Sequence, residues 1–186
     1  MISRIPINLL LILCLGSSFI AGASTLQQRD HLTQKEVDLV KEAQVLDKRI
    51  DVFIKAAERR LMVINNTSAA NAKQLKKDSE RWGELPTGSR AELVGDIARI
   101  LDEAITNIDD VSSRDERNPL ISKSLRKLAQ SVNSIMAQLK PLSADAKSEA
   151  EVASFELLNE DAQSILEAAT KLPPEVDKKA KKNEKK

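Results

Sequence analysis

Residues 89–139 read SRAELVGDIARILDEAITNIDDVSSRDERNPLISKSLRKLAQSVNSIMAQL. The stretch opens with a capping box formed by Ser89 and Glu92, in which each side chain can satisfy a free backbone N–H of the other residue. After a polar turn, Asn118 acts as a cap and Pro119 takes the first helical position, where its missing N–H costs nothing. Apolar residues recur three and four positions apart in both halves, which predicts two amphipathic helices.

Two further helical patterns flank this stretch. Thr33 and Glu36 form another capping box, and no Gly or Pro interrupts the run that follows. A continuous helix over residues 33–64 would be about 48 Å long. The last pattern starts near Ser143 and ends at Pro173, while Pro141 is expected to end the helix before it.

These four patterns, with no strand signal in the sequence, predict an all-α fold, and more specifically an antiparallel four-helix bundle. We assign the bundle to residues 33–174, after a polar lead-in at 24–32 and before a lysine-rich tail at 175–186 whose composition predicts disorder. Residues 65–88 form an unusually long connection between the first two helices. Such a connection is expected to be partly helical or functional, and residues 69–82 suit a short polar helix.

Residues 1–23 show the three parts of a secretory signal peptide: a basic residue (Arg4), an apolar run (5–15) and small residues at the end. An uncleaved anchor remains the alternative, although the segment reaches the minimum of about 17 residues only by including polar ones. Processing as a lipoprotein at Cys14 is disfavoured by the large Leu13. Cleavage would remove the single cysteine, so the exported form would have no thiol and no disulfide. We expect signal peptidase to cut after Ala23, at a site formed by Ala21, Ala23 and Ser24.

Charge and composition exclude several function classes. The chain has 29 Lys and Arg against 28 Asp and Glu, and cleavage would leave equal numbers of each. A nucleic-acid binder usually has a basic excess or a basic face, so no nucleic-acid partner is predicted. Stacking platforms for bases need aromatic side chains, and this chain has one Trp, three Phe and no Tyr. Contact with a membrane is expected only through the signal segment before cleavage.

The sequence also lacks the side chains that most catalytic and metal sites use. His31 is the only histidine and precedes the first helix, whereas a di-iron bundle needs two Glu-x-x-His motifs. A haem pair of His31 with Met62 or Met136 is conceivable, but both Met suit ordinary packing. No triad and no glycine-rich phosphate loop are present. We therefore predict a non-enzymatic protein with no cofactor and no metal. A cluster of four acids near the second turn could bind a hard cation weakly through oxygen ligands, but turn and cap residues are the favoured interpretation. The four are Asp109, Asp110, Asp115 and Glu116.

Two other positions have more than one interpretation. Trp82 lies in the long connection, where an exposed Trp would mark a contact to a partner. Trp82 and Leu85 are therefore the candidate partner contacts, although the pair would equally serve to hold the connection on the bundle. Asp47 lies near the apolar face of the first helix. It is either a functional carboxyl with a raised pKa or a residue that pairs with a nearby Lys or Arg.

Three segments resemble a group of exported all-helical bacterial proteins of unassigned function: WGELPTGSRAEL at 82–93, AITNIDDV at 104–111 and DKRIDVF at 47–53. The resemblance implies an exported helical fold and no particular activity. Residues 32–36, LTQKE, also resemble the Leu-Thr-x-x-Gln motif of periplasmic helical stress chaperones. Glu36 stands in place of the final Gln and only one copy is present, so a capping box is the more economical interpretation.

The sequence therefore predicts an exported helical protein that binds another macromolecule in the periplasm or cell envelope, as a chaperone-like or scaffolding factor. The expected partner is a protein of the cell envelope. A bundle that binds a small ligand or a cation is the alternative, and the oligomeric state stays open.

Overall fold

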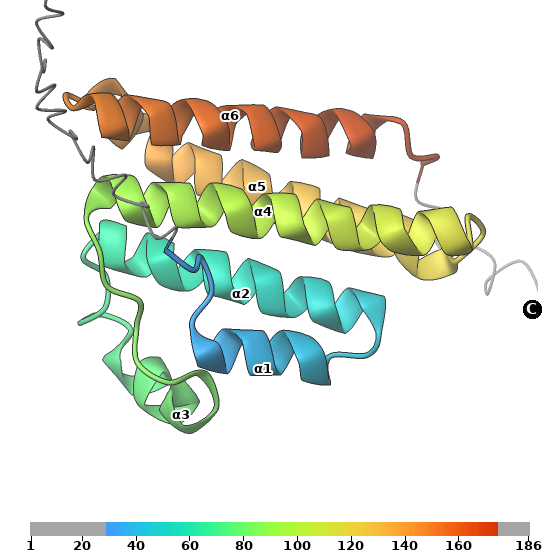
Figure 1. Cartoon of the computed structure of the whole chain (residues 1–186), viewed down its shortest axis with the longest axis horizontal. Helices are drawn as coiled ribbons and strands as arrows, with labels where there is room; N and C mark the ends of the chain where they lie inside the picture. Colours follow the sequence, from blue (N-terminus) through green and yellow to red (C-terminus); the bar gives the residue numbers. More distant parts are fainter. Residues whose placement is uncertain (1–28, 175–186) are drawn as a thin grey trace, which may run out of the picture.

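The computed structural model describes residues 29–174 and folds them into six helices, with no strand in that range (Figure 1). The all-α class is confirmed. The signal peptide, its cleavage site at Ala21, Ala23 and Ser24, most of the lead-in and the lysine-rich tail lie outside the described residues. The helices are α1 (Gln34–Glu42), α2 (Leu46–Ile64), α3 (Ala72–Trp82), α4 (Arg90–Arg114), α5 (Pro119–Ala144) and α6 (Glu149–Thr170).

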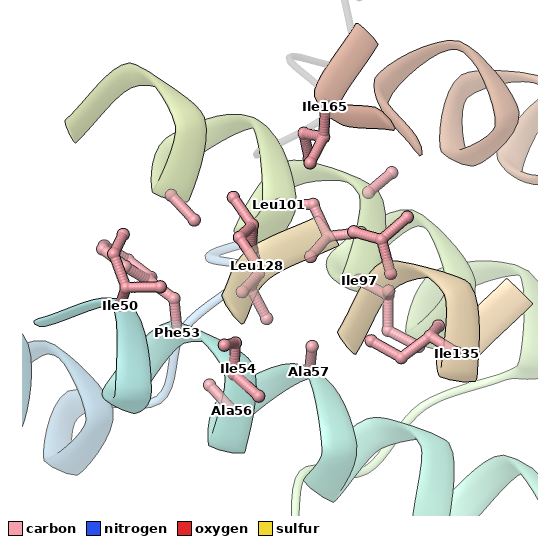
Figure 2. Packing of buried hydrophobic residues seen from close by; sticks show 14 of the residues in the cluster. Ile50, Phe53, Ile54, Ala56, Ala57, Ile97, Leu101, Leu128, Ile135 and Ile165 are labelled. Atoms are coloured by element: carbon pink, nitrogen blue, oxygen red, sulfur yellow. The ribbon is translucent and has the colours of Figure 1, made fainter. Parts of the chain in front are cut away.

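The four longest helices enclose the core. Helix α4 contacts α2 on one side and α6 on the other, and α5 contacts the same two helices. The apolar stripes of all four meet between them, as the close view in Figure 2 shows. The residues labelled there are Ile50, Phe53, Ile54, Ala56, Ala57, Ile97, Leu101, Leu128, Ile135 and Ile165, all of them buried.

The directions of these helices differ from the prediction. Arg90 and Glu151 pair at 2.8 Å near the starts of α4 and α6, so these neighbours run parallel (Figure 1). Asp47 and Lys123 pair near the starts of α2 and α5, which also run parallel. An antiparallel four-helix bundle is therefore not confirmed, because two of the neighbouring pairs are parallel and two shorter helices pack outside the four.

The predicted continuous helix over 33–64 is wrong. The chain breaks at Ala43–Val45, and α1 folds back along α2 (Figure 1). The fold-back buries Leu39 and carries Glu36 to Arg60, 24 residues further along the chain. These tertiary contacts override a local pattern that favours one helix.

The long connection is partly helical, as predicted. Helix α3 lies within it, contacts α1 and ends at Gly83, whose φ of 68° lies in the left-handed region that favours glycine. A Cβ there would approach the Lys35 side chain to 3.3 Å.

The local signals at the helix ends have mixed outcomes. Both capping boxes are present, and Asn118 caps α5 with Pro119 following it. The prediction that Pro141 ends a helix is wrong, because α5 continues to Ala144. Only three residues of α5 follow Pro141, so the helix ends within one turn of the proline. Helix α6 accordingly begins at Glu149 instead of near Ser143, with the Ser148 hydroxyl accepting from the Glu151 N–H.

Candidate functional site

Four charged side chains are enclosed where α1, α2 and α4 meet. Glu36 is fully buried, and Arg59, Arg60 and Asp96 are each only 1 % exposed. We call these four residues the ionic cluster. Charged residues are almost never this deeply buried unless they are paired, and the cluster contains two positive and two negative groups.

Arg60 is the centre of the cluster. Its two terminal nitrogens donate to both carboxylate oxygens of Glu36 at 2.8 Å, a bidentate arrangement that is stronger than a single bond. The same nitrogens donate to the carbonyls of Ala56, at 2.8 Å, and His31, at 2.6 Å. Its Nε lies 3.8 Å from Asp96. Arg60 therefore joins α1, α2, α4 and the segment that precedes α1.

Arg59 fastens the end of α3. Its Nη2 donates to three successive carbonyls, those of Trp82, Gly83 and Glu84, at 3.3, 3.1 and 2.5 Å. Its guanidinium also stands 5.7 Å from the centre of the Trp82 ring, within the range of a cation–π contact. Burial lowers the pKa of Arg59, while the charge of Glu36, 3.4 Å from its Nε, opposes that effect.

Asp96 ties the beginning of the described chain to α4. Its Oδ2 accepts from Arg29 at 3.0 Å, and Arg29 also lies 3.8 Å from Glu92. Arg99, one turn along α4, donates to the Arg29 carbonyl at 3.2 Å. Burial raises the pKa of Asp96, and the surrounding guanidinium groups oppose that rise. Part of the predicted polar lead-in is thus an integral part of the fold.

The sequence alone does not predict the ionic cluster. Its members come from three separate helices, and their spacing matches no motif. One signal was available: Arg59 and Arg60 fall between Ala57 and Leu61, which belong to the apolar stripe of α2. A pair of arginines in such a stripe indicates buried partners elsewhere in the fold.

Two clefts open on either side of Trp82. The first, which we call the α1–α3 cleft, has a volume of about 580 Å³ and lies between α1, the start of α2 and the end of α3. The second, the loop cleft, has a volume of about 450 Å³ and lies between residues 29–35 and 82–87. Trp82 lines both clefts, and Leu85 lines the second.

The structure brings Trp82 into the fold, with only 8 % of its surface exposed. This burial supports the interpretation that it fastens the connection to the helices, together with the three carbonyl contacts from Arg59. Leu85 is partly buried. A contact of Trp82 or Leu85 with a partner stays a prediction, and it would have to be made through the clefts.

Asp47 and His31 each have a side-chain partner on another helix. The carboxyl of Asp47 accepts from Lys123 at 2.6 Å, and this hydrogen bond lowers the pKa of Asp47. The interpretation as an ion-paired residue is therefore confirmed, and that of a raised pKa is wrong. His31 lies 2.8 Å from Glu103. Over residues 29–174 no group of three or more His, Asp or Glu side chains converges to hold a metal ion.

Asp161 has a different environment. One of its oxygens, Oδ2, is shielded from solvent and has no hydrogen-bond partner within the described residues. Partial burial and the negative charges of Asp102 on α4 and Glu160 raise the pKa of Asp161 to about 6. Ionised Asp161 therefore opposes the packing of α6 on α4.

We expect Asp161→Asn to stabilise the protein at pH 7.5. The folded state holds the Asp161 proton more tightly than the unfolded state, so its contribution to stability is lost as the pH rises from about 4 to about 6. A shift of about two pKa units corresponds to ~3 kcal/mol, and solvent screening at this part-exposed site reduces the expected gain to ~1 kcal/mol. Urea unfolding of wild type and variant at pH 7.5 and pH 4 measures this gain in the free energy of unfolding.

The gain should be much smaller at pH 4, where Asp161 is protonated in the folded state. Asp109→Asn is the control, since Asp109 is exposed on α4, and it should change the free energy of unfolding by less than ~0.5 kcal/mol. An equal gain at both pH values would show that the carboxyl charge is not the cause.

Comparison with known proteins assigns the chain to no family, since no family model, no curated protein and no solved structure matches it. Among the helices within residues 29–174, none combines the length and the apolar character needed to span a membrane.

Proposed function

We propose that this chain is an exported, non-enzymatic protein that binds a segment of another protein in the cell envelope. In this proposal α2, α4, α5 and α6 act as a supporting bundle, and α1 and α3 form the binding face. The observation that carries the proposal is the α1–α3 cleft of about 580 Å³. Export rests on the sequence of residues 1–23 alone.

The lining of the cleft suits the side chains of a protein partner. Leu39, Val52 and Trp82 supply apolar surface, and Val45 at the rim is 49 % exposed. The charged lining residues carry both signs: Glu42, Lys48, Asp51 and Arg81. Protein interfaces combine an apolar centre with a polar rim in this way.

Contacts within the fold fix α3, which forms one wall of the cleft. Arg59 fixes the three carbonyls that follow α3, and Lys55 pairs with Asp78 at 3.7 Å across α2 and α3. A site that is already ordered loses less conformational entropy on binding, which favours affinity. Glu42 and Arg81 at the rim form no ion pair within residues 29–174, so both charges are free to pair with a partner.

Photo-crosslinking in living cells tests this proposal. A photoreactive amino acid at Arg81 or at Glu42 should give a discrete adduct with one protein, because both side chains line the cleft. The same residue at Gln163, exposed on α6, is the matched control and should give no such adduct. The cross-linked chain should begin at Ser24. Adducts of equal intensity at all three positions, or none at any, would contradict the proposal.

A small-ligand function is the alternative, and one observation favours it. A groove of about 330 Å³ between α5 and α6 is lined mainly by Met136, Leu139, Phe155 and Leu158. Apolar pockets with a few polar groups are typical of small-ligand sites. Native mass spectrometry of protein purified from its host should show a bound mass if this alternative holds, and the unliganded mass alone would dismiss it.

A further inference from the structure

The groove between α5 and α6, which we call the α5–α6 groove, lies on the side of the long helices away from α1 and α3 (Figure 1). Its walls come from the last third of α5 and the middle of α6, and its volume is about 330 Å³. The α1–α3 cleft shares no lining residue with it. The two sites can therefore be occupied and tested independently.

Both walls of the groove are apolar. Met136 and Leu139 on α5 are three residues apart, as are Phe155 and Leu158 on α6, so each pair lies on one face of its helix. Val152, one turn before Phe155, is 42 % exposed and extends the apolar surface toward the start of α6. An elongated apolar chain can therefore lie along the groove with contacts on both sides.

One positive charge lies beside this apolar surface. Lys140 lines the groove and is exposed, and it has no ion-pair partner within residues 29–174. The earlier lysines of α5 differ from it, since Lys123 pairs with Asp47 and Lys127 pairs with Asp51, both at 2.6 Å. A lysine stem can cover apolar surface while its ammonium group stays in water. The groove thus joins an apolar wall to a cation that is free to pair with a ligand.

These features match a ligand with one alkyl chain and one negative charge. The volume of about 330 Å³ is at the lower end of the range for small-ligand sites, roughly 300–1,000 Å³, so it accommodates one chain and not two. The other polar lining residues, Ser143 and Asn159, are uncharged and can donate hydrogen bonds to a carboxylate. Lys140 is the only charged lining residue in the described chain, whereas sites for phosphate groups commonly use arginine forks.

We infer that the α5–α6 groove binds a free fatty acid, with the alkyl chain against Met136, Phe155 and Leu158 and the carboxylate paired with Lys140. Removing the methylene groups from water supplies most of the affinity. The ion pair is exposed, so it adds little affinity and serves to select anionic amphiphiles over cationic ones. The inference rests on the small-ligand alternative and does not depend on the α1–α3 cleft.

Calorimetric titration of the purified protein with octanoate, decanoate and dodecanoate tests the contact with the alkyl chain. Each step of two methylene groups should tighten binding about fifteenfold, which is the gain expected from burying them. Dodecyltrimethylammonium, which carries the opposite charge, should bind more weakly than dodecanoate. Equal affinities for the three carboxylates, or a Kd for dodecanoate weaker than about 1 mM, would overturn the inference.

A charge substitution tests the contact with the carboxylate. Lys140→Gln should weaken the binding of decanoate about threefold and leave the binding of 1-decanol unchanged, because only the carboxylate pairs with the ammonium group. Lys171→Gln is the matched control, since Lys171 is exposed just after α6 and does not line the groove, and it should change neither affinity. Unchanged decanoate binding by Lys140→Gln would contradict the assigned ion pair.

A blocking substitution tests the location. Asn159 is exposed and lines the groove, so Asn159→Trp should cover the groove without entering the core and weaken dodecanoate about fifteenfold, the equivalent of two methylene contacts. Gln163→Trp, one turn further along α6 and outside the lining, should bind like wild type. Circular dichroism shows that both variants fold. If the two variants bind dodecanoate alike, the site lies elsewhere and the inference is wrong.

Native mass spectrometry separates this inference from the alternative on which it rests. A bound mass that is not a fatty acid would overturn the inference and leave the small-ligand alternative in place. Photo-crosslinking at the α1–α3 cleft reports on the protein-binding proposal alone, because that cleft is formed by α1, α2 and α3.

Discussion

We expect Arg60→Ala to lower the free energy of unfolding by about 3–5 kcal/mol, because removing one partner of a buried ion pair leaves the other charge uncompensated. Arg60 is 1 % exposed and makes four hydrogen bonds, two of them to the fully buried carboxylate of Glu36. Arg59 touches Glu36 only at 3.4 Å and cannot replace the bidentate contact. Urea unfolding at pH 7 measures the loss.

Arg114→Ala is the matched control. Arg114 pairs with Asp110 one turn away at 3.6 Å, and both side chains are well exposed. An exposed pair of this kind contributes about 0.3–0.5 kcal/mol. If Arg60→Ala costs no more than Arg114→Ala, the ionic cluster does not stabilise the fold.

The second large effect is expected from Leu128→Ala, at about 3 kcal/mol. Leu128 is fully buried on α5, between α2 and α4 in Figure 2. The substitution loses the transfer free energy of three carbon atoms and leaves a cavity that the surrounding helices fill only partly. Thermal and urea unfolding should agree on the loss, because it arises from packing and not from charge.

Leu157→Ala removes the same atoms from a side chain that is 38 % exposed on α6. It should cost ~1 kcal/mol or less, since much of this surface is already in contact with water. Comparable losses for the two leucines would mean that the centre of the core lies elsewhere.

Local signals predicted the secondary structure well. The capping boxes at Thr33 and Ser89 and the cap at Asn118 all mark helix starts in the structure. Each of these interactions joins residues two or three positions apart, so it forms whatever the rest of the chain does. Pro141 misled the prediction because α5 continues for three residues beyond the proline before it ends.

Local sequence patterns predicted only part of the candidate site. Trp82 is the lone aromatic residue of a long connection, which made it a candidate, and it lines two clefts in the structure. Arg59, which holds the Trp82 carbonyl and ring, precedes it by 23 residues. No local pattern relates two residues at that separation.

By itself the sequence determined which segments are helical and where α1, α4 and α5 begin, because periodicity and capping act within a few residues. The tertiary structure decided three further points: the break at Ala43–Val45, the parallel courses of α4 and α6, and the assembly of the ionic cluster. Each depends on pairs such as Glu36 with Arg60 or Arg29 with Asp96, which are 24 and 67 residues apart. Burying a charge is favourable only when its partner is in place. A helix that is locally uninterrupted therefore folds back on itself to bring Glu36 to the arginines of α2.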